Sequence, residues 1–344
     1  MQLYNLKSSV DTPFRFAMKN LMSGVSLLLM LFISGCQLQK NQVKIIKDVE
    51  YATYQHQGET KPLLLDLYLP QAKSGEAMPL IIYIHGGGWR EFNKDICPGE
   101  IVAAKGKAIA CINYRYSTEA VFPAQIHDAK GAVRWLRANA DQYNLDPNRF
   151  GAWGDSAGGH LSALLGTSEG VDYLEGDQGN LEYSSGVQAV CNWYGPTDFT
   201  QVQPAFSEPI SPKVWQEYRG VPWYLYTVVT TLLLGGSVSE KTQLAQAANP
   251  INYIDSEDPP FMIVHGDLDK IVPVNQSVIL VEALESYGVP VTFVRKPKMT
   301  HSYEGQNGEN FDPELIDLAL DFFDKTLVTK ESLTTNAGFT PNPP

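Results

Sequence analysis

A set of short, continuous apolar runs constrains the fold of this chain more than any other feature of its sequence. Runs such as MPLIIYI, KAIACINY and PPFMIVH lack the alternation of apolar and polar residues that a half-exposed strand shows. They are typical of strands that are buried on both faces. Between two of them, apolar residues recur at the spacing of an amphipathic helix, at Ile126, Ala129, Val133, Leu136 and Ala140. Strands that alternate with helices predict an α/β protein with a mostly parallel sheet, covered by helices on both faces.

The runs predict strands along most of the chain, and these are KIIKDVEYATYQ, LLLDLYLP, MPLIIYI, KAIACINYRY, RFGAWG, VQAVCNWYG, PPFMIVHG and VTFVRK. Further helices are expected in AGGHLSALLG and over 315–327. Residues 200–250 do not follow this rhythm, because they are rich in aromatic residues. We expect them to form an insertion over the carboxyl ends of the strands, where the functional groups of such sheets gather.

The N-terminal segment is predicted to be a targeting sequence. Residues 21–33 are uncharged and apolar, too few to span a bilayer comfortably, and they follow basic residues. The segment ends in ISGC at Cys36, which resembles the lipobox of bacterial lipoproteins. The resemblance implies a signal peptide over 1–35, a lipid on Cys36 that anchors the chain to the membrane of the cell envelope, and, because Gln37 follows, the outer membrane. An ordinary secretory signal and an anchor helix are the alternatives.

The predicted domain organisation is a tether over 36–44, a catalytic domain over 45–328 and a polar, disordered tail over 329–344. The formal net charge is −12 and no basic run is present, which argues against a nucleic-acid partner. Besides Cys36 there are three cysteines. Cys111 and Cys191 lie in apolar runs and are expected to be small buried hydrophobic residues, whereas Cys97 is expected in a loop. Whether any two of them pair stays open at this point.

Two glycine-rich motifs point to chemistry. Gly154-Asp155-Ser156-Ala157-Gly158 lies between an expected strand and an expected helix. A serine at such a tip needs a backbone with positive φ, and its neighbours two residues away must be small, so the pattern predicts a nucleophile elbow. The second motif, His85-Gly86-Gly87-Gly88-Trp89, ends another buried strand, and its glycines expose backbone amides that can donate to an oxyanion.

HGGGW upstream of GDSAGGH resembles the α/β-hydrolase superfamily, on the branch of hormone-sensitive-lipase-like and feruloyl-esterase-like (BD-FAE type) carboxylesterases. The resemblance covers residues 45–328 and implies the α/β-hydrolase fold, with an eight-stranded sheet. It also implies an oxyanion hole formed by the amides of Gly87, Gly88 and Ala157, with His85 bracing the loop.

A serine nucleophile needs a base and a carboxylate that orients the base, and in this fold the chain order is serine, acid, histidine. Of six histidines, only His265 and His301 come late enough. By the resemblance, His301 after the last strand is the base, and Asp269, four residues after His265, is the acid, with Asp267 as the alternative. The predicted catalytic residues are therefore Ser156, Asp269 and His301.

Other residues carry weaker expectations. Trp89 and Trp223 are candidates to line the substrate pocket, with core packing as the alternative for each. His160 is expected to be structural, and Asp128 to lie on a helix surface or brace a loop. The chain contains no H-E-x-x-H, paired C-x-x-C or G-x-x-x-x-G-K-[ST] motif, and neither a metal nor a cofactor is expected.

The predicted function is a serine carboxylesterase that hydrolyses short-chain or aryl acyl esters through an acyl-enzyme. Its expected substrates are small-molecule or polysaccharide-borne esters, for example acetyl or feruloyl groups on carbohydrates. The alternatives are a prolyl-oligopeptidase-like peptidase, a lipase in which 200–250 acts as a lid, and a non-catalytic binding module. The HGGG motif argues against the peptidase, and the complete set of three catalytic residues argues against the binding module.

Overall fold

The computed structural model describes residues 43–71, 75–201, 222–302 and 311–328. The chain divides into two units, residues 1–42 and residues 43–344, and the fold below is that of the second unit. The predicted signal peptide over 1–35, Cys36, most of the tether over 36–44 and the tail over 329–344 lie outside the described residues.

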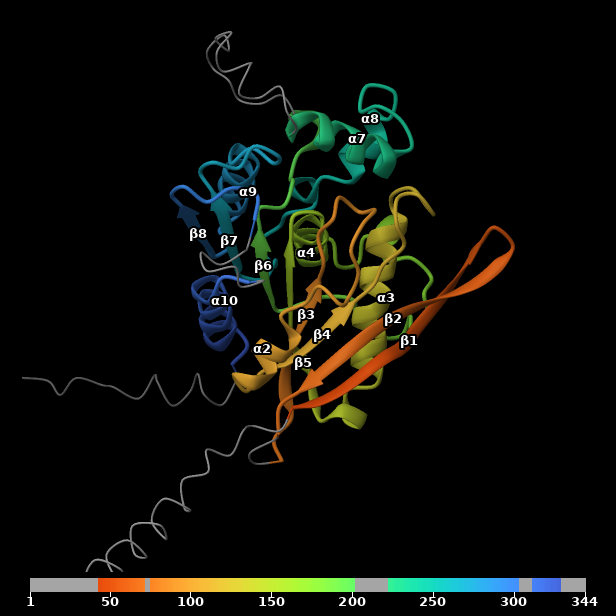
Figure 1. Cartoon of the computed structure of the whole chain (residues 1–344), viewed down its shortest axis with the longest axis vertical. Coiled ribbons are helices and arrows are strands. Elements are labelled where there is room, and N and C mark those ends of the chain that lie inside the picture. Colours follow the sequence, from red (N-terminus) through yellow and green to blue (C-terminus); the bar gives the residue numbers. More distant parts are fainter. Residues whose placement is uncertain (1–42, 72–74, 202–221, 303–310, 329–344) are drawn as a thin grey trace, which may run out of the picture. The chain divides into compact units, whose positions relative to one another are not determined.

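An eight-stranded sheet forms the centre of the unit, in the order β1-β2-β4-β3-β5-β6-β7-β8 (Figure 1). The first two strands pair antiparallel with their neighbours, and the other pairs are parallel. The α/β-hydrolase fold with a mostly parallel sheet is thereby confirmed. The strands are β1 (Lys44–His56), β2 (Glu59–Leu69), β3 (Met78–Ile84), β4 (Ala108–Ile112), β5 (Leu145–Asp155), β6 (Ala189–Trp193), β7 (Phe261–Gly266) and β8 (Val291–Lys296).

Helices cover both faces of this sheet. The α-helices are α2 (Gly99–Ala104), α3 (Ala124–Ala138), α4 (Ala157–Thr167), α5 (Asp172–Glu175), α7 (Pro222–Leu234), α8 (Thr242–Ala247), α9 (Asn275–Ser286) and α10 (Pro313–Thr326). Short 3-10 helices are η1 (Asp141–Tyr143), η2 (Phe199–Gln201) and η3 (Pro250–Asn252). Among the described residues, no helix is both long enough and apolar enough to cross a bilayer.

The continuous apolar runs are explained by two hydrophobic cores, one on each face of the sheet. Along β3, Leu80 and Ile82 belong to the core that α3, α4 and α9 cover, whereas Ile81 and Tyr83 belong to the core under α2 and α10. Successive side chains of a strand point to opposite faces, so a strand between two cores has no polar face. Helix α10 closes the second core and begins at the N-cap Asp312, whose side chain accepts a hydrogen bond from the Glu314 amide at 2.9 Å.

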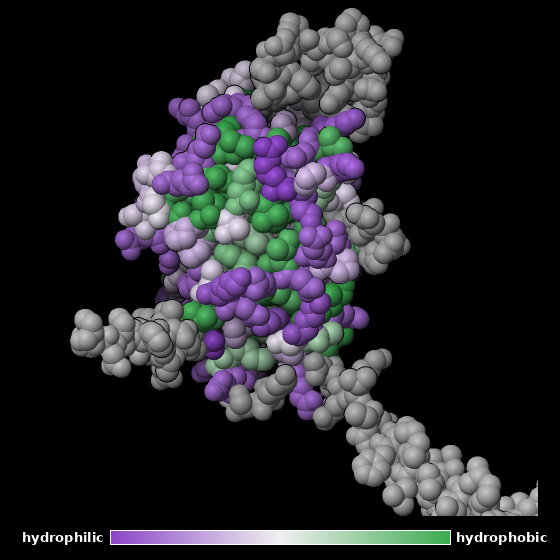
Figure 2. Space-filling model, turned by 90° about the vertical axis from the view of Figure 1, so that its left-hand side faces the viewer, coloured by the Kyte–Doolittle hydropathy of each residue, from purple (hydrophilic) through white to green (hydrophobic). Residues whose placement is uncertain are grey.

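Strand β8 is the exception, because it lies at the edge of the sheet. Its side chains are exposed or half-buried, including the half-buried Phe293 and Val294 and the exposed Thr292 and Arg295. On the side of the molecule where β8 and α10 lie in Figure 1, apolar residues are visible among polar ones (Figure 2). The edge position therefore accounts for the one parallel strand that is not buried on both faces.

The described part of the predicted insertion consists mainly of α7 and α8, which lie beyond the carboxyl ends of the central strands (Figure 1). A backbone hydrogen bond from the Phe122 amide to the Leu233 carbonyl, 2.8 Å long, joins α7 to the rest of the unit. Val229 of α7 packs directly on Gly88, since a Cβ placed on Gly88 would lie 2.7 Å from Val229 Cγ1. Residues 202–221 of the insertion lie outside the described residues.

The structure answers one open question and corrects one expectation. Cys111 is buried in β4 as expected and forms a disulfide with Cys97, while Cys191 is free and buried. The loop that follows Trp89 lies beside the end of β4, because the Lys94 amide donates to Asn113 Oδ1 at 2.7 Å, and it carries Cys97. Asp128 does not lie on a helix surface: it is fully buried, and both of its oxygens bind Arg115, whose amide also donates to it at 2.8 Å. Of the two expectations for Asp128, only that of a loop brace fits this contact.

Candidate active site

Ser156 lies at the sharp turn between β5 and α4, with φ of +52°. The turn has room only for the small neighbours that the sequence predicts. A Cβ on Gly154 would lie 2.3 Å from the Gly158 carbonyl oxygen, and one on Gly158 would lie 1.9 Å from the Ile84 carbonyl oxygen. A side chain at either position would force the turn open, so the glycines allow Ser156 to stand at the tip of β5.

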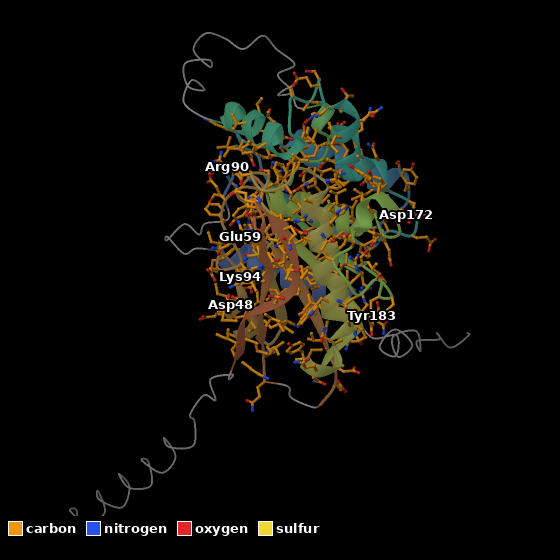
Figure 3. The ribbon with its side chains drawn as sticks, turned by 90° about the vertical axis from the view of Figure 1, so that its right-hand side faces the viewer. Asp48, Glu59, Arg90, Lys94, Asp172 and Tyr183 are labelled. Carbon is orange, nitrogen blue, oxygen red and sulfur yellow. A yellow bond between two sulfur atoms is a disulfide. The ribbon has the colours of Figure 1, made fainter. Side chains whose placement is uncertain are left out.

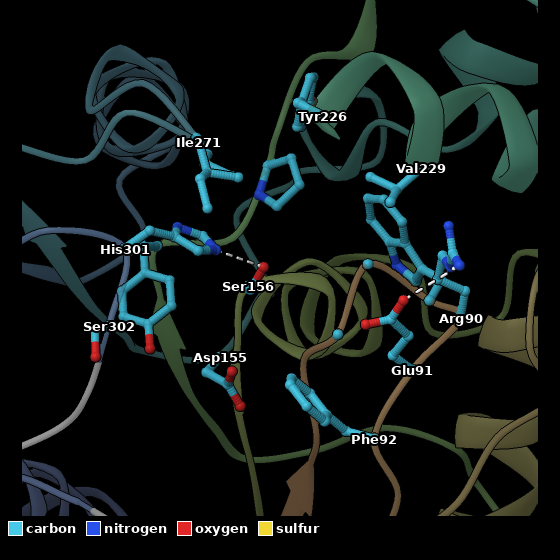
Figure 4. A pocket seen from close by; sticks show the side chains of 16 residues that line it. Arg90, Glu91, Phe92, Asp155, Ser156, Tyr226, Val229, Ile271, His301 and Ser302 are labelled. Carbon is cyan, nitrogen blue, oxygen red and sulfur yellow. Dashed lines mark hydrogen bonds and ion pairs between the residues drawn. The ribbon is translucent and has the colours of Figure 1, made fainter. Parts of the chain in front are cut away.

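The three predicted catalytic residues meet at this turn, and Figure 4 shows two of them, Ser156 and His301, joined by a hydrogen bond. His301 Nε2 lies 2.9 Å from Ser156 Oγ, and His301 Nδ1 lies 2.6 Å from Asp269 Oδ2. Asp269 follows β7 and His301 follows β8, so three loops at the carboxyl ends of parallel strands supply the residues. The structure thus places a nucleophile, a base and an orienting carboxylate in one chain of hydrogen bonds.

The environment of Asp269 keeps it ionised. Burial opposes ionisation, but hydrogen bonds from His265 and His301 outweigh burial and lower the pKa of Asp269 to about 2. Its other oxygen accepts from the amides of Ile271 and Val272 at 2.8 and 2.9 Å. At neutral pH this carboxylate therefore holds a proton on Nδ1 of His301, which leaves Nε2 free to accept the proton of the serine.

Asp267 and His265 do not take the positions of the catalytic acid and the catalytic base. Asp267 pairs with Arg295 on the surface, at 2.7 Å, so the geometry favours Asp269 as the acid. His265 Nδ1 contacts the Ser277 hydroxyl at 2.7 Å, and Nε2 contacts the Val272 carbonyl at 2.9 Å. The imidazole of His265 thereby braces the loop that carries Asp269.

The HGGGW motif forms a loop beside Ser156, which we call the oxyanion loop (residues 85–92). Its backbone has positive φ at four positions, Gly87, Gly88, Trp89 and Phe92. Within the described part of the chain, the amides of Gly87 and Gly88 donate to no other group, and neither does that of Ala157 at the first turn of α4. Gly87 and Gly88 line the same cavity as Ser156. These amides are therefore available to a ligand at the serine.

The oxyanion loop is held by its neighbours at both ends. At its start, the Tyr114 hydroxyl donates to the carbonyls of His85 and Gly86 at 2.9 and 3.2 Å, and its ring stacks on His85. Just beyond its end, Lys94 is buried and binds Asp48 and Asp66 at 2.8 and 2.9 Å. Figure 3 shows Asp48 and Lys94 near each other on one side of the unit.

The cavity at Ser156 has a volume of about 330 Å³, in the size range of small-molecule sites. Apolar walls come from both sides of the site and include Phe92, Tyr226, Val229 and Ile271. Tyr226 and Val229 belong to α7, so the described part of the insertion does contribute to the pocket, as the sequence predicts. A polar centre with apolar walls suits a small ester that carries an apolar acyl group.

The remaining candidates are Trp89, Trp223 and His160. Trp89 touches the cavity but is only 1% exposed, and it packs edge-to-face on His160 and against Phe199, so core packing dominates. Trp223 lies in α7, and its side chain is outside the described residues. His160 is buried and its Nε2 contacts the Ala248 carbonyl at 2.7 Å, a structural role. The described residues contain no group of His, Cys, Asp and Glu side chains that could hold a metal ion.

The fold and this site define an α/β hydrolase with Ser156, His301 and Asp269 in one chain of hydrogen bonds. The chain belongs to the BD-FAE family, whose model matches residues 65–284. It is 28% identical over 265 residues to the probable carboxylic ester hydrolase LipM of Mycobacterium tuberculosis, covering 74% of this chain and 58% of LipM. The chain thus spans little more than half of that relative.

Two solved structures resemble this fold closely. One is a truncated form of a carbohydrate esterase from gut microbiota, with a TM-score of 0.69 and 31% identity, covering 85% of this chain and 99% of that one. The other is a bifunctional GH43-CE protein of Bacteroides eggerthii, with a TM-score of 0.67 and 32% identity, covering 82% of this chain and 38% of that one.

Two buried charged residues near this site, Asp155 and Lys94, have no role among the sequence predictions. Asp155 lies inside the elbow motif and lines the cavity, and Lys94 lies just beyond the oxyanion loop. The position of Asp155 inside GDSAG was the only sequence signal for it. No local pattern marked Lys94, because its partners come from β2 and from the β1 segment.

Proposed function

We propose that this chain is a serine carboxylesterase that hydrolyses short acyl or aryl esters through an acyl-enzyme. One observation carries the proposal: the hydrogen-bonded chain of Ser156, His301 and Asp269 lies beside a loop with free amides at Gly87 and Gly88. Such a set of groups stabilises the charges that develop when a hydroxyl attacks an ester carbonyl.

In the proposed mechanism each step belongs to one group. Ser156 Oγ forms a bond to the carbonyl carbon while His301 Nε2 takes the hydroxyl proton, and the carbonyl oxygen becomes an oxyanion held by the amides of Gly87, Gly88 and Ala157. The tetrahedral intermediate collapses, and His301 gives the proton to the departing alcohol. Water, deprotonated by the same imidazole, then attacks the acyl-enzyme and releases the acid and Ser156.

We propose acetyl or feruloyl esters of carbohydrates as the substrate class. The two structural neighbours with more than 30% identity carry carbohydrate esterase or CE in their descriptions, which supports this choice. The cavity of about 330 Å³ leaves room for a small acyl group and a single ring near Ser156.

The test is the hydrolysis of p-nitrophenyl acetate, acetylated xylo-oligosaccharides and methyl ferulate by the wild-type chain and by Ser156→Ala. We expect wild-type turnover and a loss of at least about 10⁴-fold in the variant, because the nucleophile is gone. Ser162→Ala is the matched control, since that serine lies in α4, is buried and has a hydroxyl with no partner among the described residues. Full activity in Ser156→Ala would contradict the proposal.

We further propose that the chain is anchored in the cell envelope, in the outer membrane, by a lipid on Cys36. The Cys97–Cys111 disulfide supports export, because disulfides persist in oxidising compartments. In cells, Cys36→Ala is expected to move the protein from the membrane fraction to the soluble fraction, whereas Cys191→Ala leaves it in the membrane fraction. Membrane association of Cys36→Ala would contradict the anchor.

A further inference from the structure

Asp155, the residue before Ser156, has no part in the mechanism above. It is 5% exposed, and its Oδ1 accepts hydrogen bonds from the Tyr83 hydroxyl at 2.7 Å and from the Gly86 amide at 3.2 Å. Tyr83 belongs to β3, and Gly86 is near the start of the oxyanion loop. One carboxylate therefore joins the strand of the nucleophile to the loop that supplies the amides.

The fit between Asp155 and Gly86 is close. A Cβ on Gly86 would lie 2.4 Å from Asp155 Oδ2 and 3.0 Å from the Asp155 carbonyl oxygen, so a larger residue at 86 would displace the carboxylate. On the other side of the same peptides, the Tyr114 hydroxyl binds the carbonyls of His85 and Gly86. The first peptides of the loop are thus fixed from the amide side by Asp155 and from the carbonyl side by Tyr114.

The carboxylate also shares a cavity with the catalytic base. Asp155 and His301 line the same cavity (Figure 4). Burial raises the pKa of Asp155 to about 6, although the hydrogen bond from Tyr83 and the attraction to His301 act against it. At neutral pH the carboxyl group is therefore mostly ionised, inside a partly buried site where charges interact more strongly than in water.

Other titratable and charged groups lie near Asp155 and His301. His301 is also bound by Asp269 and contacted by the ring of Tyr194, with ring centroids 4.7 Å apart. Asp155 is faced by Tyr83 and by Tyr114, whose pKa is raised by burial and by the charge of Asp155. On the opposite wall of the cavity, Arg90 and Glu91 pair with each other at 3.2 Å.

We propose that Asp155 is a positioning residue that acts in two ways: its carboxylate fixes the Gly86 amide, and its negative charge stabilises the imidazolium that His301 becomes during attack. The inference rests on the proposed esterase function. His301 would then be influenced by two carboxylates. Asp155 acts on it through space, and Asp269 acts on it through a hydrogen bond.

The test is Asp155→Asn, which keeps an acceptor for Tyr83 and Gly86 but removes the charge. We expect kcat for p-nitrophenyl acetate to fall about tenfold with KM little changed. The acid limb of kcat/KM should move to lower pH by about half a pH unit, because the imidazolium of His301 loses a neighbouring negative charge. A purely structural role would lower kcat and leave the limb in place.

Tyr83→Phe supplies an independent variant with the opposite expected shift. It keeps the charge but removes a donor that favours the ionised carboxylate, so Asp155 would ionise at higher pH. The acid limb should then move to higher pH, with wild-type activity on the alkaline side. Tyr183→Phe, at an exposed tyrosine outside the cavity, is the control and should leave the profile unchanged.

The outcomes separate the two proposals. If the wild-type chain hydrolyses esters but neither variant moves the acid limb, the electrostatic role of Asp155 is wrong and the esterase proposal stands. If the limb moves down in Asp155→Asn and up in Tyr83→Phe, the inference is supported. A wild-type chain without ester hydrolysis would remove the proposed function and this inference with it.

Discussion

The two halves of the active site are built by different physical means. The elbow and the oxyanion loop are shaped by the backbone, with positive φ at Ser156, Gly87 and Gly88 and no room for a Cβ on Gly158. The loops after β7 and β8 are shaped by side-chain hydrogen bonds that converge on Asp269. The first half is therefore sensitive to the size of its residues, and the second to their hydrogen-bonding groups.

This difference explains why a local pattern marks the first half of the site, whereas the residues of the second half are assigned through the family resemblance. Steric demands leave glycines at fixed spacings, as in HGGGW and GDSAG. A hydrogen-bonded carboxylate leaves only an aspartate in a loop, so Asp267 and Asp269 could not be separated by local pattern. The distinction arises from which one reaches His301 and which one pairs with Arg295.

In the second half the largest effect is expected on activity. Asp269→Asn should lower kcat by about 10⁴-fold, because the amide favours the wrong tautomer of His301, while the fold is kept. Asp267→Asn is the matched control and should keep activity within about threefold, since exposed ion pairs contribute little. Esterase kinetics of both variants check this, and a larger loss of activity in Asp267→Asn would show that Asp269 is not the orienting acid.

In the first half the largest effect is expected on stability. Gly158→Ala would place a Cβ 1.9 Å from the Ile84 carbonyl oxygen and should lower the free energy of unfolding by about 4 kcal/mol, together with loss of activity. Gly170→Ala is the control, because its φ is +73° but nothing lies within 4 Å of the added Cβ. It should cost only about 1–2 kcal/mol. Equal losses in urea unfolding would show that close packing at the elbow is not the cause.

The disulfide beyond the oxyanion loop is expected to have the next largest effect on stability. It joins residues separated by 14 positions, so its removal should lower the free energy of unfolding by about 3 kcal/mol. We expect a lower melting temperature for the wild-type chain after reduction and no change on reduction of a Cys97→Ser, Cys111→Ser double variant. A reduced wild-type chain with an unchanged melting temperature would show that the disulfide contributes nothing to stability.

The smallest expected effect is a gain in stability that depends on pH. The pKa of Asp155 in the folded chain, about 6, lies above its ordinary value, so the folded state favours the protonated carboxyl group. The contribution of this group to stability is therefore present at low pH and is lost as pH rises through 6. Asp155→Asn should match the wild-type chain near pH 4 and exceed its free energy of unfolding by roughly 2 kcal/mol at pH 8. Urea unfolding at both pH values measures the difference. The same gain in stability at both pH values would show that burial of the charge does not cause it.

Much of the fold could be predicted because its signals are local. Continuous apolar runs marked β3 to β7, and helical periodicity marked α3. The Cys97–Cys111 pair, the burial of Asp128 and the contact of Asp155 with Gly86 could not be predicted, because each depends on which strands become neighbours. In particular, β3 lies directly beside β5, and only this adjacency brings the oxyanion loop to the elbow.

The central claim is that Ser156 is the residue that becomes acylated, and a covalent label tests it most directly. Diethyl p-nitrophenyl phosphate reacts with an activated serine: the serine oxygen bonds to phosphorus, p-nitrophenolate departs, and a diethylphosphoryl group takes the place of the hydroxyl proton. Mass spectrometry of the intact chain and of its peptides should find one such group, on Ser156, and none in Ser156→Ala. Labelling of Ser156→Ala to the same extent, or a label only on another residue, would contradict the account.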